Sequence, residues 1–156
     1  MLSRCRSCHG FTLTQLLITI AIAAILAVIA WPAYTHHVRQ ARIQAARAAL
    51  LENAHFMERF YQQHHSFKQT STTWPTLPAL ETGAFCIRPQ GLARGALESK
   101  FTLKAVAFDK NNEPRTIKIN EALVTTICET TASTCDDTLA YFKGGSTIDK
   151  KCTVLD

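Results

Sequence analysis

The chain has 156 residues, a length that suits one domain of ordinary size with an appendage rather than several domains. Its 17 Lys and Arg residues outnumber its 12 Asp and Glu residues, which gives a formal net charge of +5. This modest basic excess favours an acidic partner without identifying one. The Ser, His and Asp residues form no catalytic motif, so we expect no enzyme.

The first recognisable element is an apolar segment. Residues 11–38 contain no Asp, Glu, Lys or Arg. About 20 apolar residues in a helix cross a hydrocarbon core, so we expect a membrane span here. A buried core helix and a cleaved signal peptide are the alternatives. The bulky Trp31 and Pro32 stand where a signal peptidase needs small residues, which counts against the second.

The distal part of the chain carries four cysteines: Cys86, Cys128, Cys135 and Cys152. An even number in a small exported domain predicts two disulfides and an oxidising compartment. Three pairings are possible. We favour Cys86 with Cys135 and Cys128 with Cys152, and the other two pairings remain open. The C-terminal part therefore lies outside the cytoplasm and the first ten residues lie inside.

This orientation bears on the sequence CRSCHG near the start of the chain. Cys5, Cys8 and His9 have the C-x-x-C-H spacing of a c-type haem attachment site. Haem is attached outside the cytoplasmic membrane, whereas this motif would face the cytoplasm. Nine residues ahead of a span also cannot form a haem pocket. We therefore interpret residues 1–10 as a leader and expect no cofactor.

After the apolar segment, the helical pattern continues to about residue 65. Its second half carries an apolar stripe with steps of three and four residues: Ile43, Ala46, Leu50, Ala54, Met57 and Tyr61. Such a stripe must pack on something, and a sheet formed by the rest of the chain is the available partner. Residues 66–83, rich in Thr, Ser and Pro, are expected to form a loop.

Short runs of alternating polarity follow, as expected for strands of a half-buried antiparallel sheet. They cover residues 85–88, 100–107, 116–120 and 123–128, and residues 109–114 form a turn between two of them. From Glu129 onward we expect an irregular region held by the cysteines. The sequence thus predicts an α+β fold with a globular part at residues 39–156.

Basic residues are concentrated in the strand region, where residues 83–120 contain seven basic and three acidic side chains. Alternation puts Lys100, Lys104 and Lys118 on the polar face of the sheet, with Arg88 beside them. Together with Lys143, Lys150 and Lys151 they are candidates for a stripe that follows a DNA phosphate backbone. The alternative is an ordinary solvated face, since exposed strands commonly carry Lys and Thr.

A Gly-containing loop at residues 89–95 is a candidate for contacts with base edges. Gln90 suits an adenine edge and Arg94 suits a guanine edge. A simple hairpin connection is the alternative. The six histidines lack metal-ligand spacing, so we expect them on solvated helix faces and no metal site.

The stretch Gly10-Phe11-Thr12-Leu13-Thr14-Gln15-Leu16-Leu17-Ile18 resembles the class III signal of type IV pilins. The resemblance implies that prepilin peptidase cleaves between Gly10 and Phe11 and that Phe11 is then methylated. It also implies that residues 11–38 serve in membrane anchoring and filament assembly. The family usually has Glu where this chain has Gln15. The loss of that charge argues for a minor rather than a major filament subunit.

Later segments resemble the competence pilins, which are minor pilins that serve as DNA-uptake receptors. They include residues 47–58, 67–72, 74–75, 85–88, 93–97, 99–101 and 141–144. The resemblance implies a type IV pilin fold whose cysteine-bounded region folds against the sheet edge. It also implies binding of double-stranded DNA with preference for a short uptake sequence, in natural transformation. The expected partners are pilus subunits and the assembly machinery, and the expected location is the inner membrane, with a periplasmic domain, and then the pilus.

Two other functions remain open. A structural or adhesive pilin without specific DNA binding would leave the basic face merely solvated. A pseudopilin of a secretion system is less favoured, because many pseudopilins lack such disulfides.

Overall fold

The computed structural model describes residues 12–136 and 139–155. One helix is followed by five strands: α1 (Leu13–His64), β1 (Phe85–Pro89), β2 (Thr102–Ala107), β3 (Thr116–Asn120), β4 (Thr125–Thr131) and β5 (Asp149–Val154). The predicted processing residues Gly10 and Phe11 lie outside the described residues, as do Cys5, Cys8 and His9.

Helix α1 begins with a reciprocal cap. The backbone N–H of Gln15 donates to Thr12 Oγ1 at 3.3 Å, and the Thr12 N–H donates to Gln15 Oε1 at 3.2 Å. This is the capping-box arrangement, which satisfies donors that a helix start leaves free. The effect of Gln15 on filament assembly stays a prediction.

The N-terminal part of α1 is long and apolar enough to cross a membrane, by length and composition, with a mean hydropathy of 2.6 over its most apolar window. The chain divides into two compact units at the boundary between Val38 and Arg39. The second unit, residues 39–156, contains the sheet, both hydrophobic clusters and both disulfides.

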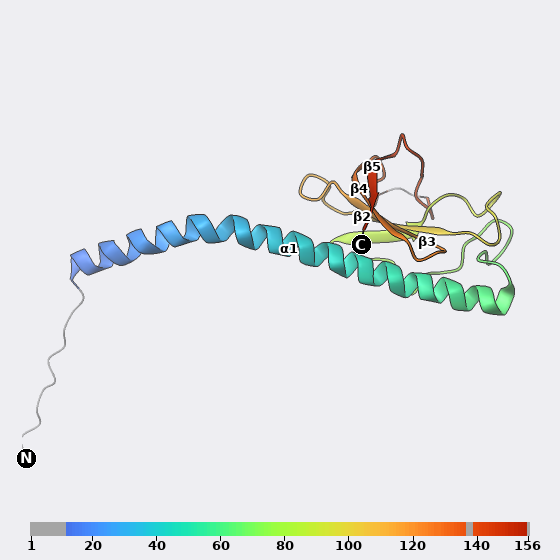
Figure 1. The fold of residues 1–156 in the computed structure, drawn as a ribbon, viewed down its shortest axis with the longest axis horizontal. Helices are drawn as coiled ribbons and strands as arrows, with labels where there is room; N and C mark the ends of the chain where they lie inside the picture. The colour runs from blue at the N-terminus through green and yellow to red at the C-terminus, as the bar shows by residue number, and fades with distance from the viewer. Residues whose placement is uncertain (1–11, 137–138, 156) are drawn as a thin grey trace, which may run out of the picture. The chain divides into compact units, whose positions relative to one another are not determined.

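The sheet is an antiparallel meander in the order β1-β2-β3-β4-β5. The C-terminal part of α1 lies along one face (Figure 1) and buries the predicted stripe, with Ile43, Ala46, Leu50, Ala54 and Met57 at most 2 % exposed. The facing residues alternate along three of the predicted strand ranges: Phe85, Ile87, Phe101, Leu103, Ala105, Ala107, Ile117 and Ile119.

A buried polar side chain inside this interface was not predicted. Asn53 is fully buried, and its amide donates to Ala79 O at 2.6 Å while its carbonyl accepts from the Ala79 N–H at 3.0 Å. The Asn53 side chain thus satisfies both the N–H and the C=O of Ala79, as a neighbouring strand would. It holds the α1–β1 loop (residues 65–84) on the helix.

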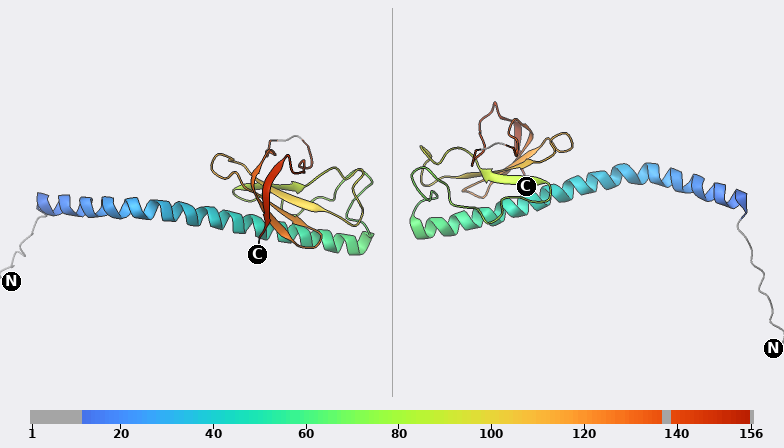
Figure 2. Two further views of the ribbon diagram at one scale, coloured as in Figure 1. Left: turned by 45° about the horizontal axis from the view of Figure 1, so that its top comes forward. Right: turned by 180° about the vertical axis from the view of Figure 1, so that it is seen from behind.

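The opposite face of the sheet was predicted to be polar and exposed, and the structure shows that it is covered. The β4–β5 segment (residues 132–136 and 139–148) lies on that face, away from α1 (Figure 2). Phe142 is fully buried there in a second apolar cluster with Cys86 and Val106. The cysteine-bounded region therefore covers this face with the β4–β5 segment and extends the sheet at its edge with β5.

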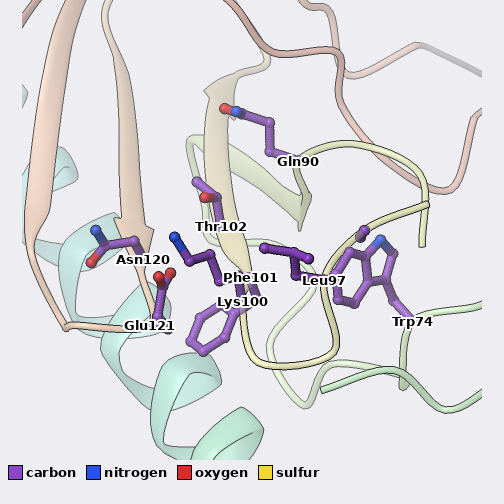
Figure 3. Close-up of a pocket in the computed structure, with 9 residues that line it drawn as sticks. Trp74, Gln90, Leu97, Lys100, Phe101, Thr102, Asn120 and Glu121 are labelled. Carbon is purple, nitrogen blue, oxygen red and sulfur yellow. The ribbon is translucent and has the colours of Figure 1, made fainter. Parts of the chain in front are cut away.

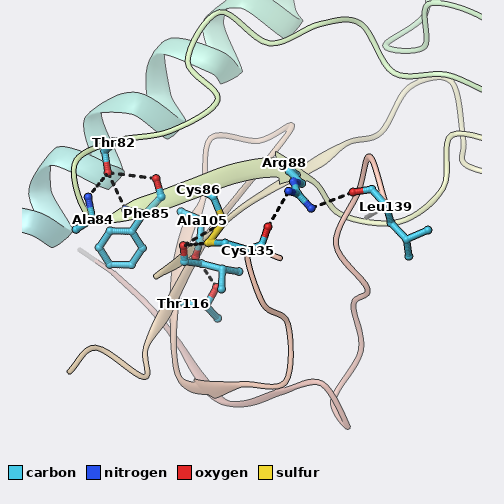
Figure 4. Close-up of a disulfide and its surroundings, with 10 residues drawn as sticks. Thr82, Ala84, Phe85, Cys86, Arg88, Ala105, Thr116, Cys135 and Leu139 are labelled. Atoms are coloured by element: carbon cyan, nitrogen blue, oxygen red, sulfur yellow. Dashed lines mark hydrogen bonds between the residues drawn. A yellow bond between two sulfur atoms is a disulfide. The ribbon is translucent and has the colours of Figure 1, made fainter. Parts of the chain in front are cut away.

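Two disulfides stabilise this arrangement, and they are the favoured pair. Cys86 is bonded to Cys135, and Cys128 is bonded to Cys152. The first joins β1 to the β4–β5 segment (Figure 4), and the second joins the neighbouring strands β4 and β5.

Candidate nucleic-acid interface

Two loops meet at the end of β1. The β1–β2 loop (residues 90–101) and the β4–β5 segment are joined by backbone hydrogen bonds. The Gly91 N–H donates to Phe142 O at 2.8 Å, and the Phe142 N–H donates to Pro89 O at 2.8 Å. Trp74 adds a third chain segment, because its indole N–H donates to Gly91 O at 2.9 Å. Loops fixed in this way can present side chains in a constant arrangement.

Three of the predicted DNA-binding residues are exposed on these two loops. Arg94 and Lys100 lie on the β1–β2 loop, and Lys143 lies on the β4–β5 segment. The β1–β2 loop turns sharply at Gly91 and Gly95, with φ angles of 85° and 82°, a region that favours glycine. The structure thus brings the cations of two distant sequence segments to neighbouring loops.

Lys100 also lines an open depression of about 420 Å³ between this loop and the β3–β4 turn. Its walls include Trp74, Leu97, Asn120 and Glu121, and Figure 3 shows the Lys100 amine on the side of Asn120 and Glu121. Lysine is a phosphate-binding side chain, and the carboxylate of Glu121 beside Lys100 opposes that role because it repels phosphate.

Lys104 does not lie on a DNA-accessible surface, which corrects the prediction. Its side chain is fully buried on strand β2 beneath the β4–β5 segment. The ammonium donates to Asp149 Oδ1 at 2.5 Å and to Ser133 Oγ at 2.8 Å. Burial lowers the pKa of Lys104 below its ordinary value, and the hydrogen bond to Asp149 acts in the opposite direction.

Arg88 and Lys118 are likewise not part of an open basic face. Arg88 is half-buried and donates to Cys135 O at 2.9 Å and to Leu139 O at 3.0 Å (Figure 4). The side chain of Lys118 is 16 % exposed and lies 3.4 Å from Asp149 Oδ2. Arg88 holds the β4–β5 segment on the sheet, and Lys118 pairs with the first residue of β5. A role for them in DNA binding stays a prediction.

Gln90 is placed differently from the predicted base contact. Its Oε1 is buried and has no hydrogen-bond partner among the described residues. Its amide end lies against Gly144 of the β4–β5 segment. A bidentate contact with adenine needs both amide atoms in a groove. In this position Gln90 cannot make it, and the side chain packs between the two loops instead.

Lys150 and Lys151 are exposed on β5, at the other edge of the sheet from β1. Lys151 forms an ion pair with Glu129 at 2.8 Å, which raises the pKa of Lys151. Because the β4–β5 segment covers the sheet between them and the β1–β2 loop, the predicted stripe is not continuous across the face.

Asp149 is the important residue that the sequence pattern did not indicate. It is buried, and it accepts from Thr131 Oγ1 at 2.6 Å as well as from the two lysines. The available signal was Lys104 itself, a lysine flanked by Leu103 and Ala105 in an otherwise apolar strand. Such a lysine needs a buried carboxylate. No group of His, Cys, Asp and Glu that could hold a metal occurs among the described residues.

A long N-terminal helix on a five-stranded antiparallel sheet, with a disulfide-held C-terminal region, is the fold of type IV pilins, and solved structures agree. The minor DNA-uptake pilin ComP from Neisseria subflava, solved by NMR, is 50 % identical with a TM-score of 0.60. The match covers 72 % of this chain and 94 % of that one. The type IV pilin ComP from Neisseria meningitidis is 59 % identical with a TM-score of 0.53, over 78 % of this chain and 99 % of that one.

Family comparisons give the more specific assignment. The prokaryotic N-terminal methylation motif matches residues 5–31. The family described as "Type IV minor pilin ComP, DNA uptake sequence receptor" matches residues 32–132, and the chain belongs to this family. It is a family of pilins and not one of enzymes. A comparison with curated proteins found no match.

Proposed function

We propose that this competence pilin binds extracellular double-stranded DNA, prefers a short uptake sequence, and delivers DNA for natural transformation. One observation carries the proposal. Two loops, joined by the hydrogen bond from the Gly91 N–H to Phe142 O, present Arg94, Lys100 and Lys143 to solvent. The family description, a DNA uptake sequence receptor, supports the same function.

The chemistry of these loops fits a duplex. Lysines contact phosphates and release counterions, which provides affinity without sequence information. Arginine is the side chain that most often pairs with a guanine edge. Arg94 therefore is our candidate for reading sequence, while Lys100 and Lys143 hold the backbone.

The processing and location follow from the N-terminal segment. Prepilin peptidase cleaves after Gly10, Phe11 is methylated, and the apolar part of α1 anchors the protein in the inner membrane before assembly. The methylation motif at residues 5–31 and the apolar helix support this part of the proposal. In this account pilus subunits and the assembly machinery are its protein partners, and the globular unit is periplasmic before it reaches the pilus.

The test compares single variants of the full chain in detergent micelles for retardation of two duplexes. One duplex carries the uptake sequence and the other is scrambled at equal composition. Lys100→Ala and Lys143→Ala should weaken binding to both duplexes and each lower the salt slope by about one. Arg94→Ala should in addition reduce the preference by about tenfold or more.

Arg59→Ala is the matched control, because Arg59 is an exposed cation on α1 and its loss changes the net charge equally. It should leave both affinities near those of the unmodified chain. If all four variants lose the same affinity, bulk charge explains binding and the loops have no special role. If the unmodified chain retains no DNA, a structural pilin is the better assignment.

A further inference from the structure

One buried cluster is not explained by DNA contact. The Lys104 ammonium has three acceptors: Asp149 Oδ1 at 2.5 Å, Ser133 Oγ at 2.8 Å and Lys143 O at 3.2 Å. An ammonium has three donors, so all of them are used. The lysine has no exposed surface.

The three acceptors are distributed along the β4–β5 segment and its end. Ser133 lies at its start, Lys143 in its second half, and Asp149 directly after it as the first residue of β5. A single point on strand β2 thus fixes two points of the covering segment and the residue at which β5 begins. The carboxylate is fixed in turn, since it also accepts from Thr131 Oγ1 at 2.6 Å and lies 3.4 Å from Lys118 Nζ.

Stability alone does not explain a charged pair at this position. Replacing a buried ion pair by well-packed apolar residues is often neutral or stabilising. Apolar contacts, however, are not directional, whereas hydrogen bonds from one ammonium to three defined oxygens fix the path of the backbone. One of those oxygens is the carbonyl of Lys143, a cation of the candidate interface.

We propose that Lys104 and Asp149 are positioning residues, which hold the β4–β5 segment in the conformation that presents Lys143 to DNA. This inference rests on the proposed function. Lys104 acts through the segment and never touches the nucleic acid. Removing the pair therefore changes the preference between DNA sequences more than it changes the stability of the fold.

The test uses the double variant Lys104→Met/Asp149→Leu in the full chain in detergent micelles. A single apolar variant, such as Asp149→Leu alone, would leave the buried Lys104 ammonium without its main acceptor and lose much stability. The double variant removes both charges, so the net charge and the bulk attraction to DNA stay unchanged. Asp149→Asn is the second variant, because it keeps the size of the side chain and an acceptor for Lys104.

Hydrogen exchange in the absence of DNA measures the positioning directly. We expect amides of residues 143–148 to exchange about tenfold faster or more in the double variant, while amides of α1 and β2 keep their protection. If Lys104 and Asp149 only stabilised the fold, their removal would instead speed amide exchange throughout the globular unit, residues 39–156. Asp149→Asn should give a smaller increase in the same residues.

Duplex retardation then measures how the double variant changes the preference between DNA sequences. The ratio of affinities for uptake-sequence and scrambled duplexes should fall by about tenfold, with the salt slope of scrambled DNA unchanged. Unchanged exchange in both variants would overturn the proposal. A slope lowered by about one with unchanged exchange would also overturn it, since Lys104 would then contact a phosphate. If the unmodified chain does not distinguish the duplexes, the proposed function fails, and the exchange result still decides the positioning.

Discussion

Gly144 of the β4–β5 segment packs against the side chain of Gln90, which precedes the Gly91 turn of the other loop. A Cβ added there would overlap the side-chain end of Gln90, so that side chain or the loop would have to move. Overpacking of this kind costs about 1–3 kcal/mol, and we expect Gly144→Ala to lower the free energy of unfolding by about 1–2 kcal/mol. Denaturant unfolding measures this change, and duplex retardation should show a reduced preference for the uptake sequence.

Gly83→Ala is the matched control, because no atom lies within 4 Å of a Cβ added at Gly83. This variant should unfold and bind DNA like the unmodified chain. If Gly144→Ala behaves in the same way, the packing of Gln90 against the β4–β5 segment has no importance for the interface.

The surroundings of three single residues could not be predicted from the sequence. Alternation correctly put Lys104 on the face of β2 that points away from α1. It could not show that the β4–β5 segment covers that face, because the covering depends on a fold of residues far away in the chain. The same is true of Gln90, whose environment is set by Gly144, and of Asn53, whose partner is the backbone of Ala79.

At the scale of elements, the two disulfides have different structural roles. Cys86–Cys135 attaches the β4–β5 segment to β1 across 49 residues of sequence, whereas Cys128–Cys152 joins two strands that are already hydrogen-bonded. From the loop lengths, we expect Cys86→Ala/Cys135→Ala to cost about 4 kcal/mol and Cys128→Ala/Cys152→Ala about 3 kcal/mol in unfolding free energy.

The two double variants should differ more in DNA binding than in unfolding free energy. Loss of Cys86–Cys135 should abolish most of the preference for the uptake sequence, because the segment that carries Lys143 loses its covalent bond to β1 and is then held there by the hydrogen bonds of Pro89 and Arg88. Loss of Cys128–Cys152 should leave the preference in place. Thermal unfolding and duplex retardation on the same samples measure both effects, and an equal loss of preference in both variants would refute this division of tasks.

The elements themselves were largely predictable. The helix was expected over residues 11–65 and is observed at Leu13–His64, and the alternating strands and favoured cysteine pairing are confirmed. Local periodicity determines these features. Strand β5 and the course of the β4–β5 segment were not predicted, because their residues show no regular alternation and are held by long-range contacts with Lys104, Arg88 and Cys86.

At the scale of the whole molecule, the net charge of +5 overstates the charge available to DNA. Three of the nine predicted contacts, Arg88, Lys104 and Lys118, bind residues of the β4–β5 segment or Asp149 of β5 instead. The remaining cations on the paired loops are Arg94, Lys100 and Lys143. Affinity for a random duplex should therefore be modest, and specificity should depend on the arrangement of the loops rather than on total charge.

The central claim is that the paired loops read a DNA sequence. The most direct measurement is retardation of the uptake-sequence duplex and its scrambled counterpart by the full chain at two salt concentrations, with both disulfides formed. We expect a clear preference that persists at the higher salt, with a log–log salt slope of about −2 for the two phosphate contacts of Lys100 and Lys143. Equal binding to both duplexes that disappears at the higher salt would contradict the claim and leave only a basic surface.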